Sequence, residues 1–219
     1  MPTITQITQQ KKRANRRSVH LDGKFAFGCN INVVARFGLH EGMSLTAEEL
    51  AAIEQGGVRQ ECFDQAMRFL EKRLHSRSEL RTKLMRQEIG PGIIDSVLEQ
   101  LVELNYLNDA AFSEARAEAA AKYKHHGRNR AMMELARKGV ARETARQAVE
   151  GVYEAHDSMA IARDLARKKI PSLRRLEPLV AKRRLYGLLL RRGFDYDTIK
   201  PVVEEVLGAL DDVGVDGVE

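Results

Sequence analysis

The feature that most constrains the fold is an internal repeat. Three copies of one 22-residue pattern start at Leu80, Ala131 and Leu185. The starts lie 51 and then 54 residues apart, and no copy needs an internal gap. Periods of this size are typical of arrays in which each repeat buries its apolar face against its neighbours. The sequence therefore predicts three stacked units in an elongated, curved array.

Each copy predicts two helices joined by a tight turn. Glu88, Gly139 and Gly193 occupy one position just after a helical stretch, where glycine, which adopts positive φ freely, commonly ends a helix. The next stretch carries apolar residues at the i, i+3, i+4 and i+7 spacing of an amphipathic helix. The three stripes are Ile94, Val97, Leu98 and Leu101; Ala145, Ala148, Val149 and Val152; and Ile199, Val202, Val203 and Val206.

Another helical stretch precedes each copy, at 62–74, 109–123 and 157–169. Each unit is therefore predicted to contain three helices over about 50 residues. In the first unit, the capping-box pattern Ser76–Glu79 predicts the start of the second helix.

The first 57 residues have a different pattern. Val19–Leu21 and Lys24–Phe27 flank Asp22-Gly23, a pair suited to the type I′ turn of a β-hairpin. Thr46–Glu49 is a capping box that predicts the start of a short helix. Gly56-Gly57 should then break the chain, because glycine weakens a helix interior.

The predicted fold class is mainly α, with tandem three-helix repeats after a small N-terminal extension of β-hairpin and short helices. The predicted segments are 1–57 for the extension, 61–108, 109–156 and 157–207 for the repeats, and 208–219 for a disordered acidic tail.

Charge is uneven along the chain. The protein carries 36 Lys and Arg against 31 Asp and Glu, a net charge of +5. The third repeat alone holds 12 basic and 7 acidic residues, and 11–17 forms a second basic cluster. An anionic partner is therefore expected, and the third repeat is the strongest candidate to meet it.

Several classes of protein are excluded by absent patterns. No apolar run is long enough to span a bilayer, and the N-terminus has no apolar signal segment. Cys29 and Cys62 form neither a disulfide framework nor a metal-binding pair, so two reduced thiols in a cytoplasmic protein are expected.

No catalytic, cofactor or metal constellation is found either. The chain lacks a Walker loop, a GxSxG elbow and an HExxH motif. His125-His126 is best interpreted as a solvated loop, and carboxylates such as Glu134 alternate with bases such as Lys138 as exposed helix pairs do. We therefore expect no enzyme activity.

The basic residues leave two interpretations open. Arg86, Arg137 and Arg191 recur at a helix end, where they stabilise the negative end of the helix dipole or form a row of cations for a repeating anionic surface. Lys182–Arg184 and Arg191-Arg192 place five cations on about three turns, which indicates either a solvated face or a nearby anion. The aromatic residues fall mostly on apolar faces and belong to the core.

The motifs, taken in order, resemble the bacterial regulatory RecX family. They are SRSELRTKL, IIDSVLEQLVELNYLNDAAFSEA, GRNRAMMELARKGV and LYGLLLRRGFDYDTIKPVV, preceded by the hairpin VHLDGKFAFG, and the resemblance covers residues 3–207. The chain departs from the family pattern at Glu88, where a small residue is usual, and in its alanine-rich second repeat.

The resemblance implies a regulator without enzyme activity. Family members bind along the groove of the RecA–DNA filament and inhibit the ATPase and strand-exchange activities of the recombinase. They thereby influence recombination, DNA repair and the SOS response. The implied partners are the RecA filament and, weakly or through the filament, DNA. A cytoplasmic monomer without cofactors is expected.

The contact residues are expected from charge, not from the family motifs. They are Arg73, Arg77, Arg128, Arg130, Arg137, Lys138, Lys182, Arg183, Arg184, Arg191 and Arg192. The alternative is a direct DNA-binding protein of helix-turn-helix type. Three similar units without a dimer seam favour the filament regulator, because base reading usually relies on one recognition helix in a symmetric dimer.

Overall fold

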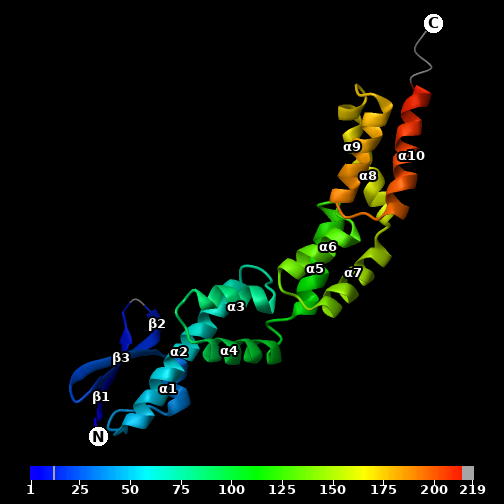
Figure 1. The fold of residues 1–219 in the computed structure, drawn as a ribbon. Coiled ribbons are helices and arrows are strands. Elements are labelled where there is room, and N and C mark those ends of the chain that lie inside the picture. Colours follow the sequence, from blue (N-terminus) through cyan, green and yellow to red (C-terminus); the bar gives the residue numbers. More distant parts are fainter. Residues whose placement is uncertain (12, 214–219) are drawn as a thin grey trace. The chain divides into compact units, whose positions relative to one another are not determined.

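The computed structural model describes residues 1–11 and 13–213 of the chain. Within this part, three strands and ten helices follow one another, and the mainly α fold predicted from the sequence is confirmed (Figure 1). The backbone divides into two compact units. The first contains Met1–His75 and Leu80–Leu107, and the second contains Ser76–Glu79 and the chain from Asn108 onward.

The first unit begins with a three-stranded antiparallel sheet in the order β1-β2-β3. The strands are β1 (Ile4–Gln10), β2 (Arg13–Leu21) and β3 (Lys24–Asn30). Asp22 and Gly23 connect β2 to β3 with φ of 49° and 80°, as a type I′ turn requires. The predicted hairpin is therefore confirmed, and β1 adds a third strand to it.

The sheet packs on helix α1 (Ile31–Phe37) and on the first half of helix α2 (Ala47–Leu70). The capping box of α2 is formed: the Thr46 hydroxyl accepts from the Glu49 N–H, and the Glu49 carboxylate accepts from the Thr46 N–H. The buried side chains of this core are Ile4, Val19, Cys29, Val33, Leu39, Leu45 and Ile53.

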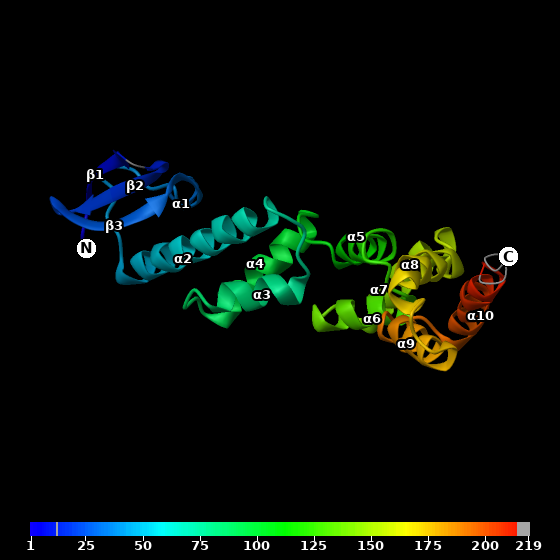
Figure 2. The same ribbon diagram turned by 90° about the horizontal axis from the view of Figure 1, so that it is seen from above.

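The chain break predicted at Gly56-Gly57 is wrong. Helix α2 passes through both glycines without interruption and is one long helix in Figure 2. Its two halves are held in different cores, since Ile53 packs beneath the sheet and Cys62 packs in the first repeat. Packing on both sides outweighs the weak helix propensity of two glycines, about 1 kcal/mol each.

Polar contacts hold the sheet against the second half of α2. Arg16 of β2 forms an ion pair with Glu61, and the Asn30 amide donates to the Asp64 carboxylate at 2.8 Å. Gly56 lies directly under the Phe37 ring, where an added Cβ would be 2.6 Å from a ring carbon. The glycine is required there by close packing and does not act as a break.

The remaining helices form three-helix repeats, as predicted. The second half of α2 is followed by α3 (Arg77–Met85) and α4 (Pro91–Glu103). The second repeat contains α5 (Asp109–Lys122), α6 (Arg128–Arg137) and α7 (Arg142–Ala155), and the third contains α8 (Ser158–Leu173), α9 (Pro178–Arg191) and α10 (Tyr196–Val213). Each repeat has its own buried core, and the predicted stripes of α4, α7 and α10 point into these cores.

The predicted left-handed position at the end of each repeat's second helix is confirmed. Glu88, Gly139 and Gly193 have φ of 57°, 69° and 88°. The backbone thus adopts the same turn three times, once with a residue for which positive φ costs about 1 kcal/mol.

The tail expected from residue 208 is wrong in its first part. Helix α10 continues to Val213, six residues beyond the predicted end of the third repeat. Residues 214–219 lie outside the described part of the chain.

Two alanine substitutions in α2 test whether its glycines are structurally equivalent. Gly57→Ala should raise the free energy of unfolding by about 0.5–1 kcal/mol, because nothing lies within 4 Å of the added Cβ. Gly56→Ala should be at least about 1 kcal/mol less stable than Gly57→Ala, because its Cβ meets the Phe37 ring. Urea unfolding followed by circular dichroism measures both, and equal stabilisation would show that the helix is not held against this ring.

Candidate nucleic-acid and filament interface

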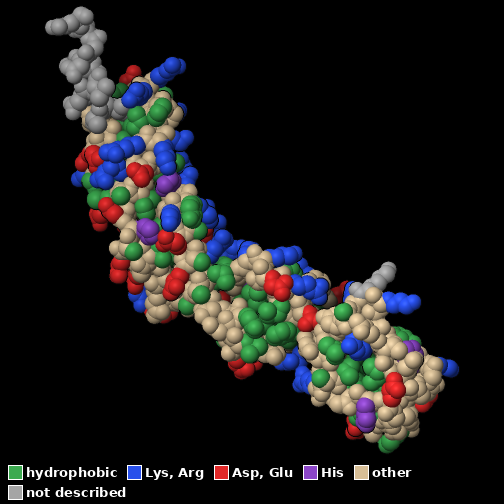
Figure 3. All heavy atoms as spheres, turned by 180° about the vertical axis from the view of Figure 1, so that it is seen from behind, with side chains coloured by type: hydrophobic (Ala, Val, Ile, Leu, Met, Phe, Trp, Pro, Cys, Tyr) green, Lys and Arg blue, Asp and Glu red, His purple; other side chains and the backbone are tan. Residues whose placement is uncertain are grey.

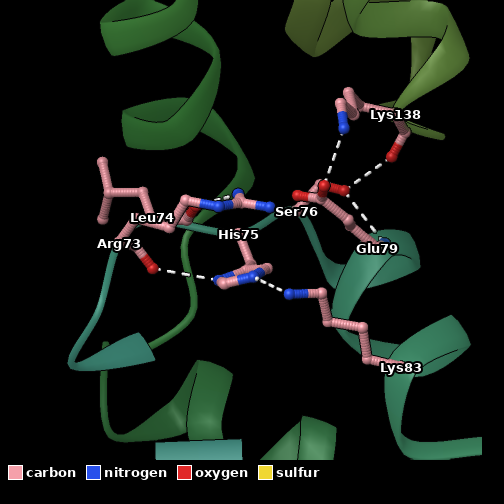
Figure 4. Close-up of polar contacts among 7 residues, drawn as sticks. All are labelled: Arg73, Leu74, His75, Ser76, Glu79, Lys83 and Lys138. Carbon is pink, nitrogen blue, oxygen red and sulfur yellow. Dashed lines mark hydrogen bonds and ion pairs between the residues drawn. The ribbon is translucent and has the colours of Figure 1, made fainter. Parts of the chain in front are cut away.

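The second unit is organised by a contact between helix ends. At its start, the Ser76 hydroxyl donates to the Lys138 carbonyl at 2.5 Å, and the Lys138 ammonium reaches the Glu79 carboxylate at 2.7 Å (Figure 4). Ser76 also accepts from the Glu79 N–H, as the predicted N-cap should. The first turn of α3 therefore caps the last carbonyls of α6.

The glycine at the end of α6 allows this approach. A Cβ added to Gly139 would lie 2.2 Å from the Ser78 hydroxyl oxygen, closer than any side chain can approach. Gly139 is therefore constrained twice, by its positive φ and by the helix turn packed on it.

The same contact recurs between α6 and α9. The Gly127 N–H donates to the Arg192 carbonyl at 2.8 Å, and the Asn129 N–H donates to the Gly193 carbonyl at 3.2 Å. A Cβ on Gly193 would lie 2.3 Å from the Arg130 nitrogen. In both contacts the positive N-terminal end of one helix meets the negative C-terminal end of the other, which is electrostatically favourable.

Six of the eleven predicted contact cations have structural partners. Lys138 pairs with Glu79, and the Arg192 guanidinium donates to the Lys124 carbonyl at 2.5 Å. The Arg128 guanidinium donates to the Tyr153 carbonyl at 3.1 Å, and Arg130 lies 3.9 Å from Glu134. Lys138, Arg192 and Arg128 therefore connect different elements of the second unit, whereas the Arg130 pair lies within α6.

Of the remaining two cations with partners, Arg73 precedes α3 and Arg77 is the first residue of α3. The Arg73 guanidinium donates to the Leu74 carbonyl, and its own carbonyl accepts from Nδ1 of the buried His75 (Figure 4). Nε2 of His75 in turn accepts from Lys83 at 2.8 Å. The Arg77 N–H donates to the Asp109 carboxylate at 2.7 Å. Both arginine side chains are in exposed residues, but their backbone is fixed.

The other five predicted cations are exposed. Within the described residues, no hydrogen-bond or ion-pair partner is found for Arg137, Lys182, Arg183, Arg184 and Arg191. Four of the five are on α9. In the space-filling view, Lys and Arg side chains line one edge of the second unit (Figure 3). The structure thus divides the eleven predicted cations into six that have partners within the protein and five that are exposed.

Two adjoining hollows lie along α9. One, of about 650 Å³, is lined by Lys169 and Ser172 of α8 and by Arg183, Arg184 and Arg191 of α9. The other, of about 680 Å³, is lined by Asn129 and Arg130 of α6 and by Arg191, Arg192 and Gly193. Both share Leu188 and Arg191, and none of the described residues that line them is acidic. We call the two together the α9 groove.

Sequence reasoning missed Lys169, Ser172 and Asn129 as members of this groove. Lys169 contributed only to the net charge of the third repeat, and nothing in its local pattern distinguished it from its neighbours. Its position opposite α9 follows from helix packing, which the one-dimensional pattern does not specify.

A charged cluster lies beside the groove at the α5–α6 connection. Lys124 and His126 lie 2.9 Å and 3.1 Å from the two carboxylate oxygens of Glu134. Burial lowers the pKa of His126; nearby Glu134 opposes this effect, while Arg192, Lys124 and Arg130 add to it. The Tyr153 hydroxyl donates to the His126 carbonyl at 2.6 Å, and burial raises the pKa of that hydroxyl. His126 is thus neutral near pH 7 and is part of the packed connection, not the solvated loop expected from the sequence.

Neither a metal site nor a membrane-crossing helix is found where the structure describes the chain. No group of three or more His, Cys, Asp or Glu side chains could hold a metal ion there. Among the described helices, none is both long enough and apolar enough to cross a bilayer.

The fold defines a class of protein built from a small sheet domain and three three-helix domains. Four family models match the chain in order. They describe the regulatory protein RecX N-terminal domain at residues 2–46 and the first, second and third three-helix domains of RecX at 62–101, 108–149 and 156–203.

Relatives and solved structures agree with these matches. Regulatory protein RecX of Bacillus velezensis is 30% identical over 94% of this chain and 78% of its own length, and that of Bacillus subtilis is 29% identical over the same shares. A crystal structure of regulatory protein RecX matches with a TM-score of 0.78 at 21% identity, over 95% of this chain and all of that one. RecX from Lactobacillus salivarius matches with a TM-score of 0.63 at 21% identity, over 68% of this chain and 96% of its own. The chain belongs to the RecX family.

The contact between α6 and α9 predicts that one added methyl group at Gly193 strongly destabilises the fold. Gly193→Ala should lower the free energy of unfolding by about 1–3 kcal/mol more than Gly38→Ala does. Both glycines have positive φ, but a Cβ on Gly38 meets nothing within 4 Å, so Gly38→Ala measures the backbone strain alone. Chemical denaturation of the two variants supplies the comparison. Equal destabilisation would mean that the α6–α9 contact is not tight in solution.

Because His126 is neutral in the folded protein, the stability of the fold should fall in mild acid. The pKa of His126 is lower in the folded protein than in the unfolded chain. At a pH between these two pKa values, the unfolded chain binds the proton and the folded protein does not. The contribution to stability is therefore complete above the unfolded value of about 6.5 and is lost as pH falls from there. His126→Asn should lose less stability than the parent between pH 7.5 and 5.5. An unchanged pH dependence would exclude His126 as the titrating group.

Proposed function

We propose that the chain binds along the RecA–DNA filament and inhibits the ATPase and strand-exchange activities of the recombinase. Membership of the RecX regulatory family supports this proposal. The observation that carries it is the α9 groove, where Arg183, Arg184 and Arg191 are exposed and no acidic residue is found among the described residues that line it. Such a surface favours an extended polyanion, and its binding should weaken with salt.

The repeat architecture supports a filament as the target. Several weak contacts made by the repeats of one chain add to a strong attachment when the target repeats as a polymer does. In this proposal the protein acts by occupying a surface that the incoming duplex needs and by opposing the conformational cycle of ATP hydrolysis. It acts without catalysis of its own.

We further propose a cytoplasmic monomer with two reduced thiols. Cys29 and Cys62 are both buried, and burial raises the pKa of Cys62 to about 11. A thiol with a raised pKa is largely protonated at neutral pH and reacts slowly. The influence on recombination, DNA repair and the SOS response follows from inhibition of the filament.

Titration of the protein into a preformed filament of RecA and single-stranded DNA tests the proposal. Inhibition of ATP hydrolysis is expected below one protein per recombinase protomer. The charge-reversed triple variant Arg183→Glu, Arg184→Glu and Arg191→Glu should require at least tenfold more protein for the same inhibition, because each reversal replaces attraction by repulsion.

The matched control reverses three exposed cations of the same repeat outside the groove, Arg174→Glu, Arg175→Glu and Lys200→Glu. This variant should inhibit nearly as well as the parent. An undiminished ATPase at saturating protein, together with tight saturable binding to bare duplex DNA, would reject the filament regulator and favour the direct DNA-binding alternative.

A further inference from the structure

Arg59 of α2 is a half-buried arginine for which the described part of the chain supplies no carboxylate. Its Nε donates to the Ser96 hydroxyl of α4 at 3.1 Å, which fixes the plane of the guanidinium group and leaves its two terminal nitrogens for another partner. Charged side chains are seldom buried without a partner of opposite charge. Other partly buried arginines follow this rule: Arg16 binds Glu61, Arg81 binds Asp95 and Arg163 binds Glu205.

The guanidinium group of Arg59 belongs to the wall of a hollow in the first unit. The hollow has a volume of about 560 Å³ and is formed by the end of α1, the middle of α2 and the start of α4. Arg36 of α1 also lines it and lies over the Phe37 ring, 5.8 Å from the ring centroid. None of the described residues that line the hollow is acidic. Two cations from different helices therefore line one space that lacks a counter-charge.

Apolar groups and open backbone form much of the remaining wall. Phe37 and Ile93, both half-buried, line the hollow together with the two arginines. Gly90 and Gly92 line it at the start of α4, and a Cβ added to either would meet nothing within 4 Å. A pocket with apolar walls and a few charged groups suits a ligand that joins an anionic group to an apolar body.

We propose that this hollow binds an acidic segment of a partner protein, with an Asp or Glu carboxylate on Arg59 and Arg36 and a neighbouring apolar side chain against Phe37 and Ile93. A carboxylate is planar and can accept two parallel hydrogen bonds from the terminal nitrogens of one guanidinium group. A phosphodiester chain fits less well, because it is bound by a longer run of cations. The proposal goes beyond the proposed function, since this site is in the first unit and includes no residue of the α9 groove.

Titration of the isotope-labelled protein with the blocked peptide acetyl-Leu-Glu-Leu-Glu-Leu-amide tests the site by NMR. Saturable shifts are expected for the amides of Gly56, Gly92 and Ser96, which line the hollow. The same peptide with Gln in place of Glu should bind at least tenfold more weakly, because it cannot form charge-assisted hydrogen bonds with the arginines. The absence of saturable binding at millimolar peptide, or equal binding of the Gln peptide, would overturn the proposal.

Removal of the two cations tests the assignment of residues. The double variant Arg36→Gln and Arg59→Gln should weaken peptide binding at least tenfold. The control Lys24→Gln and Arg86→Gln removes the same charge from exposed residues of the same unit that do not line the hollow, and should change the affinity less than twofold. Equal weakening by the two double variants would overturn the site, because binding would then follow net charge alone.

A second pair of variants leaves both arginines in place. Ala52 is exposed and lines the hollow, so Ala52→Glu supplies the missing carboxylate from the chain itself and should weaken peptide binding at least fivefold. Ala51→Glu adds the same charge at an exposed neighbour outside the hollow and should change the affinity less than twofold. Equal effects of the two substitutions would contradict the proposal. All these measurements are made without recombinase, so their outcome is independent of filament regulation.

Discussion

The second unit depends on a contact in which the start of one helix closes the end of another. The contact occurs twice, with Gly139 and Gly193 at the receiving ends. Carbonyl groups that a helix end leaves without partners accept hydrogen bonds there from the start of another helix: from α3 at the end of α6, and from α6 at the end of α9. A glycine is needed for two independent reasons, because the backbone has positive φ and because the neighbouring turn occupies the space of a Cβ.

This constraint explains why the first repeat tolerates Glu88 where the other two repeats have glycine. Glu88 also has positive φ, at 57°, but the residue is exposed, with no helix start closed over it as over the two glycines. A side chain has room there, so only the backbone strain opposes it. The contact also divides the cations by role. Lys138 and Arg192 form hydrogen bonds within the protein beside the helix ends, whereas the cations exposed on α9 remain available to a partner.

The sequence predicted those features that local patterns determine. The three left-handed turns, the apolar stripes and the Asp22-Gly23 hairpin follow from spacing and residue type alone. The break at Gly56-Gly57 was wrong because the Phe37 ring, from another element, stabilises the helix that the glycines weaken. Lys169 was missed because its place in the groove results from the packing of α8 on α9, which no local pattern encodes. The site residues themselves stay a prediction from charge.

The contact between α6 and α9 builds one side of the α9 groove, on which the proposed function depends. The most direct test is the affinity of Gly193→Ala for the RecA–DNA filament, measured beside Gly38→Ala at a temperature where circular dichroism shows both variants folded. We expect at least fivefold weaker binding for Gly193→Ala, because the α6 side of the groove is displaced from α9 while every cation is retained. Equal filament affinity of the two variants would contradict it.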